Sequence, residues 1–145
     1  ISFKRNIKKL EQKDGRIASL INNFFQKELK KEKTVFIGED ILSPYGGAFK
    51  ISENLSTKFP DKVFSSPISE AGIVGLGNGL SLNGFKPYVE IMFGDFITLC
   101  MDQLINHASK FKHMYNHQVN SNIVIRTPMG GHRGYGPTHS QSLEK

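Results

Sequence analysis

The sequence is poor in cysteine and contains no tryptophan, no internal repeat and no long hydrophobic run. Its single cysteine, Cys100, excludes an internal disulfide framework and a cysteine-based zinc site, and is typical of a reducing compartment. No apolar stretch approaches the roughly 20 residues that a membrane-spanning helix needs. No charged-then-apolar signal segment opens the chain. We therefore expect a cytoplasmic protein without a membrane partner.

The charge is unevenly distributed along the chain. The 145 residues carry 19 Lys plus Arg against 13 Asp plus Glu, a net charge of +6, and ten of the basic residues lie within positions 4–33. Because the excess belongs to one end, a basic surface for nucleic acid over the core is not supported, and we expect no nucleic-acid partner. The length suits one domain, which we place at residues 15–145 after a basic lead-in or linker at 1–14. The start at Ile1 and the end at Lys145 suggest a fragment of a longer polypeptide.

Helical and strand patterns alternate along the chain. Apolar residues recur at three- and four-residue spacing in the segments that we expect to be helical, and short apolar runs separate them. We predict helices over residues 16–31, 49–59, 71–82 and 96–114, and strands over 34–37, 63–65, 88–92 and 123–126. This alternation predicts an α/β fold with a mostly parallel sheet flanked by helices, and ligands at the carboxyl ends of the strands.

Glycines at 72, 75, 77 and 79 lie in one of the predicted helices. Each costs about 1 kcal/mol of helix stability relative to alanine, so close helix packing or a nearby ligand is needed to explain them. A dinucleotide-binding loop is the alternative interpretation. It requires glycines in the turn between strand and helix, at another spacing, and the helix-packing interpretation is therefore favoured.

Several acids and histidines are candidates for chemistry. Glu70 follows a probable N-cap, Ser69, in the first turn of a helix, where an acid commonly serves only to complement the helix dipole. His139 lies in a loop, where a lone histidine is usually polar surface. The remaining histidines show no convincing ligand spacing, although His113 and His117 are four residues apart, and we predict no transition-metal site.

Four sequence segments, taken together, contain Glu70 and His139. They are FIGEDILSPYGGAFKIS, SSPISEAGIVGLGNGLSLNGFKPYVEIMFGDF, MDQLINHASK and RTPMGGHRGYGPTHSQS. In this order they resemble the beta subunit of thiamine-diphosphate-dependent 2-oxo acid dehydrogenases, and the resemblance covers residues 15–145. It implies the thiamine-diphosphate-binding fold of the transketolase pyrimidine domain.

The resemblance also implies roles for five residues. Glu70 would hydrogen-bond the aminopyrimidine ring of thiamine diphosphate and promote its imino form, which acts as an internal base. Met92 and Phe96 would pack about that ring, and Glu39 would belong to a polar channel that couples two cofactor sites. His139 would face the substrate and the transfer of the acyl group to a lipoyl group. Glu70 and His139 are thus the predicted catalytic residues, and Glu39, Glu70, Met92 and Phe96 the predicted cofactor-binding residues.

The resemblance further implies partners. An alpha subunit, or a fused alpha domain, would bind the diphosphate and its magnesium ion. A second beta copy would complete a heterotetramer, and a lipoyl acyltransferase would accept the acyl group. The family's C-terminal domain is absent from this sequence, so we expect the fragment alone to be inactive. The alternatives are a transketolase-like, deoxyxylulose-phosphate-synthase-like or acetoin-dehydrogenase-type enzyme of the same fold, and a non-catalytic interaction module. The string HSQS argues against the transketolase-like and synthase-like types.

Overall fold

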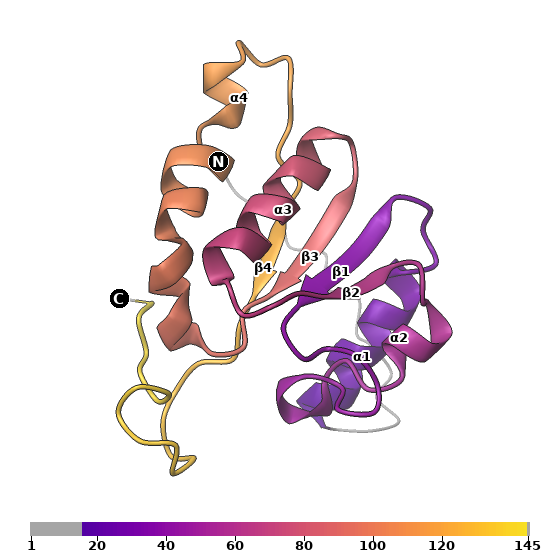
Figure 1. Cartoon of the computed structure of the whole chain (residues 1–145), viewed down its shortest axis with the longest axis vertical. Coiled ribbons are helices and arrows are strands. Elements are labelled where there is room, and N and C mark those ends of the chain that lie inside the picture. Colours follow the sequence, from indigo (N-terminus) through magenta and orange to yellow (C-terminus); the bar gives the residue numbers. More distant parts are fainter. Residues whose placement is uncertain (1–15, 145) are drawn as a thin grey trace, which may run out of the picture.

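Four short apolar runs form the strands of one parallel sheet, which lies between two layers of helices (Figure 1). This computed structural model describes residues 16–144, so the predicted lead-in at residues 1–14 lies outside the described part. The sheet has the order β2-β1-β3-β4, and every neighbouring pair is parallel. The strands are β1 (Thr34–Gly38), β2 (Val63–Ser65), β3 (Lys86–Glu90) and β4 (Val124–Arg126). The predicted α/β class is confirmed.

Alternating side chains of the central strands supply two hydrophobic cores. Phe36 and Tyr88 face α1 (Ile17–Glu28) and α2 (Leu55–Lys58), and the Phe25 ring of α1 stacks on Phe36 with 4.5 Å between the ring centroids. The neighbouring residues Val35 and Val89 face α3 (Glu70–Leu82) and η2 (Gly94–Cys100) on the other side. This two-residue period covers both faces of the sheet, as a parallel sheet requires.

Helix α3 begins and packs as its sequence predicts. The Ser69 hydroxyl accepts a hydrogen bond from the Gly72 amide and so caps the first turn. Gly77 lets the helix approach the sheet, because a Cβ atom there would lie 2.7 Å from Val89 Cγ2 and 2.8 Å from Ile123 Cδ1. A Cβ atom at Gly79 would meet nothing within 4 Å, so the packing explanation does not extend to that glycine.

The prediction of one helix over residues 49–59 is wrong. The structure has a 3₁₀ turn, η1 (Ala48–Lys50), and the short helix α2, with Asn54 between them at φ 61°. The Asn22 side chain of α1 donates to the carbonyl oxygens of Ile51 (2.8 Å) and Glu53 (3.0 Å). These bonds to α1 replace helical hydrogen bonds, although the apolar spacing still buries Ile51.

The long helix predicted over residues 96–114 is also wrong. It is divided into the 3₁₀ helix η2, the π-helix η3 (Gln103–Ala108) and one turn, α4 (Phe111–Met114). The buried Asn78 side chain of α3 donates to the Gln103 carbonyl oxygen (2.8 Å), so tertiary contact competes with regular helix at this point. Strand β3 begins two residues earlier than the predicted range 88–92. Among the described residues, no helix combines the length and apolarity needed to cross a bilayer.

Glu28, at the end of α1, ties this helix to the sheet. Its carboxylate accepts hydrogen bonds from Lys31, from Tyr88 Oη (2.8 Å) and from Lys86 Nζ (3.2 Å), and the residue is buried. The hydrogen bond from Lys31 lowers the pKa of Glu28 most, burial opposes it, and the bonds from Tyr88 and Lys86 bring the pKa from its ordinary 4.5 to about 2. The ionised carboxylate therefore favours the folded state.

Replacing Glu28 by glutamine is expected to remove an acid-sensitive part of the stability. Because the folded-state pKa is depressed, this contribution is fully present above the unfolded-state pKa and is lost as pH falls from about 5 toward 2. Urea unfolding should show a wild-type advantage of about 1–2 kcal/mol at neutral pH that shrinks at about pH 3, after allowance for the exposed lysines. Glu32→Gln, at an exposed glutamate nearby, is the control. A difference independent of pH would contradict this role.

Candidate functional site

The predicted site residues follow strand ends at one edge of the sheet. Glu39 comes directly after β1, Glu70 opens the helix after β2, Met92 and Phe96 follow β3, and His139 lies in the segment after β4. Since all four strands are parallel, their carboxyl ends share this edge, which the arrowheads in Figure 1 mark. In such sheets ligands bind at the carboxyl ends.

Two buried acids, Glu39 and Glu70, lie close to each other at this edge. Glu39 and Glu70 are 6% and 8% exposed, and the Ser69 amide donates to Glu39 Oε1 at 3.3 Å. Burial raises the pKa of Glu39, the nearby charge of Glu70 raises it further, and the hydrogen bond from Ser69 opposes both. The structure thus brings two buried carboxyl groups together, and the capped start of α3 fixes the position of one of them.

Aromatic rings form the second cluster. The His139 ring lies edge-on to Phe93 and to Phe96, with 5.0 Å between centroids in each case. Phe93 also contacts Tyr135 at 5.7 Å and Phe49 at 6.2 Å. These contacts join segments that follow β1, β3 and β4. The half-buried His139 is therefore held against an apolar wall.

Helix α3 lies next to both the pair of acids and the aromatic cluster, because it begins at Glu70 and packs against β3 and η2. Cys100 lies at the end of η2 near Glu70. Burial raises the pKa of the Cys100 thiol, and the negative charge of Glu70 raises it further. Met92 is half-buried after Ile91. It takes part in none of the ring contacts and hydrogen bonds described for residues 16–144.

Sequence reasoning missed several residues of this edge. Phe93 has four aromatic neighbours among the described residues, and the sequence predicts no role for it. Glu90, 2% exposed, pairs with Arg126 across β3 and β4; burial raises the pKa of Glu90, and Arg126 opposes that effect. Asp95 accepts hydrogen bonds from Gln141. A charged residue in an apolar run, as at Asp95 in FGDF, was the available signal for that contact.

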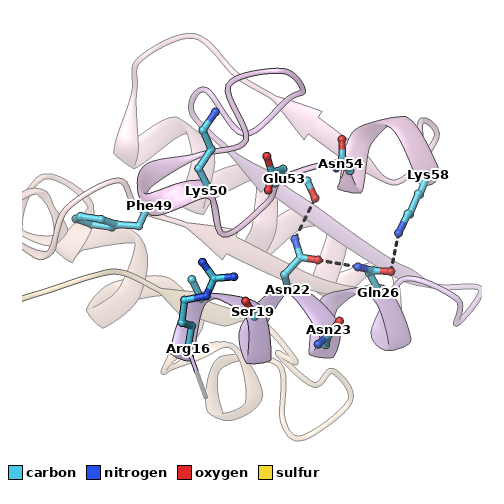
Figure 2. Close-up of a pocket in the computed structure, with 11 residues that line it drawn as sticks. Arg16, Ser19, Asn22, Asn23, Gln26, Phe49, Lys50, Glu53, Asn54 and Lys58 are labelled. Atoms are coloured by element: carbon cyan, nitrogen blue, oxygen red, sulfur yellow. Dashed lines mark hydrogen bonds between the residues drawn. The ribbon is translucent and has the colours of Figure 1, made fainter. Parts of the chain in front are cut away.

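The predicted site residues line neither of two pockets found in the described chain. One, of about 410 Å³, lies between α1 and the segment 49–58. In Figure 2, Lys58 donates to Gln26, Gln26 to Asn22, and Asn22 to the Glu53 carbonyl oxygen, so these four residues form one chain of hydrogen bonds along the pocket. The other, of about 540 Å³, includes Lys33 and Thr34 at the amino end of the sheet. The first pocket adjoins the aromatic cluster through Phe49, which lines it and contacts Phe93, whereas the second lies at the opposite end of the sheet.

The described residues contain no group of three or more His, Cys, Asp or Glu side chains placed to hold a metal ion. His113 belongs to α4, whereas His117 lies beyond that turn with φ 61°. The four-residue spacing of this pair therefore does not correspond to one continuous helical face.

Comparison with known proteins gives a family match over all the described residues. The sequence profile described as "Transketolase, pyrimidine binding domain" matches residues 16–144. The chain is 37% identical over 130 residues to the pyruvate dehydrogenase E1 component subunit beta-1, mitochondrial, of Oryza sativa subsp. japonica, covering 89% of this chain and 35% of that protein.

Two further relatives carry different substrate names. The 2-oxoisovalerate dehydrogenase subunit beta of Bacillus subtilis is 35% identical over 126 residues, covering 86% of this chain and 38% of the relative. The beta subunit of acetoin:2,6-dichlorophenolindophenol oxidoreductase of Cupriavidus necator is 32% identical over 133 residues, covering 85% and 39%. The chain thus spans between a third and two fifths of the length of these relatives.

Proposed function

The chain belongs to the transketolase pyrimidine-binding domain family, and we infer from this membership that it supplies the pyrimidine-binding part of a thiamine-diphosphate-dependent 2-oxo acid dehydrogenase. The similarity to pyruvate and 2-oxoisovalerate dehydrogenase beta subunits supports this choice within the family. The proposed reaction is decarboxylation of pyruvate or a branched-chain 2-oxo acid, followed by transfer of the acyl group to a lipoyl group.

The observation that carries the proposal is the buried carboxylate of Glu70 at the sheet's carboxyl edge. A carboxylate in this position can share a proton with a ring nitrogen of an aminopyrimidine, which a neutral side chain does poorly. Glu70 is 8% exposed and lies near Glu39, whose pKa is raised by burial and by the charge of Glu70, so this edge presents a poorly solvated carboxyl group to a basic ring nitrogen. The donor set at this edge therefore fits the cofactor's ring.

The remaining residues have complementary roles. Met92 and Phe96 present a thioether and a ring, which suit the faces of a flat heterocycle. Glu39, close to Glu70, would belong to the polar channel that couples the two cofactor sites of the assembly. When bound, thiamine diphosphate supplies the electron sink for decarboxylation. His139 would hold or release a proton at the substrate oxygen during acyl transfer, from its place against Phe96.

The site would be completed by a partner. The predicted residues line neither of the two pockets described above, which suits one wall of an interface. We propose that an alpha subunit or domain holds the diphosphate and magnesium, that a second beta copy joins the assembly, and that a lipoyl acyltransferase receives the acyl group.

The isolated chain is expected to bind thiamine diphosphate weakly, because it offers pyrimidine contacts without a diphosphate and magnesium site. Titration calorimetry should show an affinity at least about 100-fold below that of the assembly with its alpha partner, a difference of about 2.7 kcal/mol. Omitting magnesium should affect only the assembly. Tight magnesium-dependent binding by the chain alone would show that the phosphate site has been misplaced.

An acetoin-cleaving enzyme is the second candidate, favoured by the similarity to the Cupriavidus necator protein. Assays of the assembled enzyme with pyruvate, a branched-chain 2-oxo acid and acetoin separate the two proposals. Turnover of acetoin alone would support this alternative.

A further inference from the structure

The loop of residues 128–141, which carries His139, is fastened to two consecutive residues of η2. At one end the Gly94 amide donates to the Pro128 carbonyl oxygen (2.8 Å), and at the other the Gln141 amide donates to Asp95 Oδ1 (3.2 Å). The Gly130 amide donates to the Gln141 carbonyl oxygen (3.2 Å) and so joins the two ends of the loop to each other. Both ends of the loop are therefore hydrogen-bonded to Gly94 and Asp95, while Arg133 and Tyr135 in its middle contact the rings of Phe49 and Phe93.

Gly94 allows the first attachment, its hydrogen bond to Pro128, because it has no side chain. A Cβ atom at this position would lie 2.1 Å from Met129 Cγ, so only glycine lets the loop approach this closely. The first attachment is steric, whereas the second depends on the chemistry of Asp95.

Asp95 makes two hydrogen bonds through one carboxylate oxygen. Oδ1 accepts from the Gln141 amide and, at 2.9 Å, from Gln141 Nε2, while the residue is 7% exposed. Burial raises the pKa of Asp95, but the two bonds from Gln141 and the proximity of His139 outweigh it, and the pKa is lowered. Charge-assisted hydrogen bonds of this kind are stronger than neutral ones, and their loss would leave a carboxylate buried without partners.

The same attachment determines where the His139 ring lies. Asp95 lies between Phe93 and Phe96 in the sequence, and these are the two rings that hold His139 edge-on at 5.0 Å. Gln141 is only two residues beyond His139, so an attachment at Gln141 leaves the imidazole little freedom to leave these rings. The Thr138 hydroxyl, 2.9 Å from His139 Nδ1, is exposed and is a weaker constraint.

We propose that Asp95 is a positioning residue, whose carboxylate holds Gln141 and thereby keeps the His139 imidazole between Phe93 and Phe96. Asp95 acts through the loop and need not contact the substrate. The catalytic consequence of this placement rests on the proposed function of His139, whereas the placement itself can be measured without activity.

A swapped pair tests the contact. Gln141→Glu places a second carboxylate against Asp95 at an exposed position, where loss of folding is not expected. Adding Asp95→Asn removes the repulsion and restores a donor and an acceptor. By NMR of the 145-residue chain, Gln141→Glu should shift the His139 ring protons toward random-coil values and speed exchange of the residue-141 amide by about 10-fold or more. The double variant should reverse most of both changes.

The matched control is Asp102→Asn, at an exposed aspartate just after η2, which should leave the His139 resonances unchanged. Unchanged His139 resonances and amide exchange in Gln141→Glu, or no reversal in the double variant, would overturn the positioning role.

The catalytic consequence is measured in the assembly with the alpha partner. Gln141→Glu should slow acyl transfer to the lipoyl group by about 10-fold, and the double variant should recover it, while proton exchange at the cofactor changes little. If the NMR signals respond and acyl transfer does not, Asp95 positions the loop and the proposed role of His139 fails instead. The two failures are therefore distinguishable.

Discussion

Replacement of Glu70 by glutamine is expected to lower turnover of the assembled enzyme by about 100-fold or more, the range that general acid–base groups contribute. Glutamine has nearly the same shape and can still hydrogen-bond the aminopyrimidine, so thiamine diphosphate should remain bound with modest loss. It cannot share a carboxyl proton with the ring nitrogen. Binding and catalysis should therefore separate, and the measurements are cofactor affinity beside the rate of proton exchange at the thiazolium carbon.

Ser69→Ala is the matched control for Glu70. It removes the hydroxyl that caps α3 while the Glu70 carboxylate remains, and should cost about 1 kcal/mol of stability with proton exchange largely retained. If Glu70→Gln left exchange near the wild-type rate, Glu70 would be only an acid that opens a helix. If Ser69→Ala matched the loss caused by Glu70→Gln, the effect would come from helix α3 rather than from the proton.

The sequence predicted the strands and the edge because these depend on local patterns. Strand β2 was predicted with its observed ends, and β1 within one residue, since short apolar runs between turn residues have few other uses in a parallel sheet. Parallel order then brings Glu39 and Glu70 to one edge without further information. The capping of α3 by Ser69 is equally local.

The parts that could not be predicted depend on contacts across long sequence separations. The helix expected over 49–59 is interrupted because the side chain of Asn22, about 30 residues earlier, donates hydrogen bonds to the carbonyl oxygens of Ile51 and Glu53. The contact of Asp95 with Gln141 crosses 46 residues and has no periodic pattern. The local sequence FGDF does not indicate which residue will hydrogen-bond Asp95, so this attachment of the loop is found only from the structure.

The buried charges at the carboxyl edge fall into two types with different consequences. Asp95 and Glu90 have partners in this chain, Gln141 and Arg126, and these contacts fix the loop and the ends of β3 and β4. Glu39 has one hydrogen bond, from the Ser69 amide, and lies near the charge of Glu70; burial and that charge raise the pKa of Glu39. Such a pair is costly for stability and suited to binding a basic ring, which favours a functional explanation for these two acids.

Replacement of His139 by alanine is expected to slow acyl transfer to the lipoyl group by about 100-fold, while proton exchange at the thiazolium carbon changes by less than about threefold. The reason is its location: the imidazole lies against Phe93 and Phe96 on the loop after β4, whereas the proton sharing assigned to the cofactor's pyrimidine belongs to Glu70 at the start of α3. Loss of His139 should therefore affect the step in which the acyl group moves.

Single-turnover assays of the two half-reactions in the assembled enzyme measure this division directly. His132→Ala provides the matched control, because His132 is an exposed histidine of the same loop and should leave both half-reactions within about twofold of the wild type. His139→Gln keeps a hydrogen-bonding side chain but cannot carry the imidazole's proton, so it should resemble the alanine variant if proton transfer matters and the wild type if only packing does. Equal losses in proton exchange and acyl transfer for His139→Ala would contradict the assignment, because they would place the histidine in the same step as Glu70.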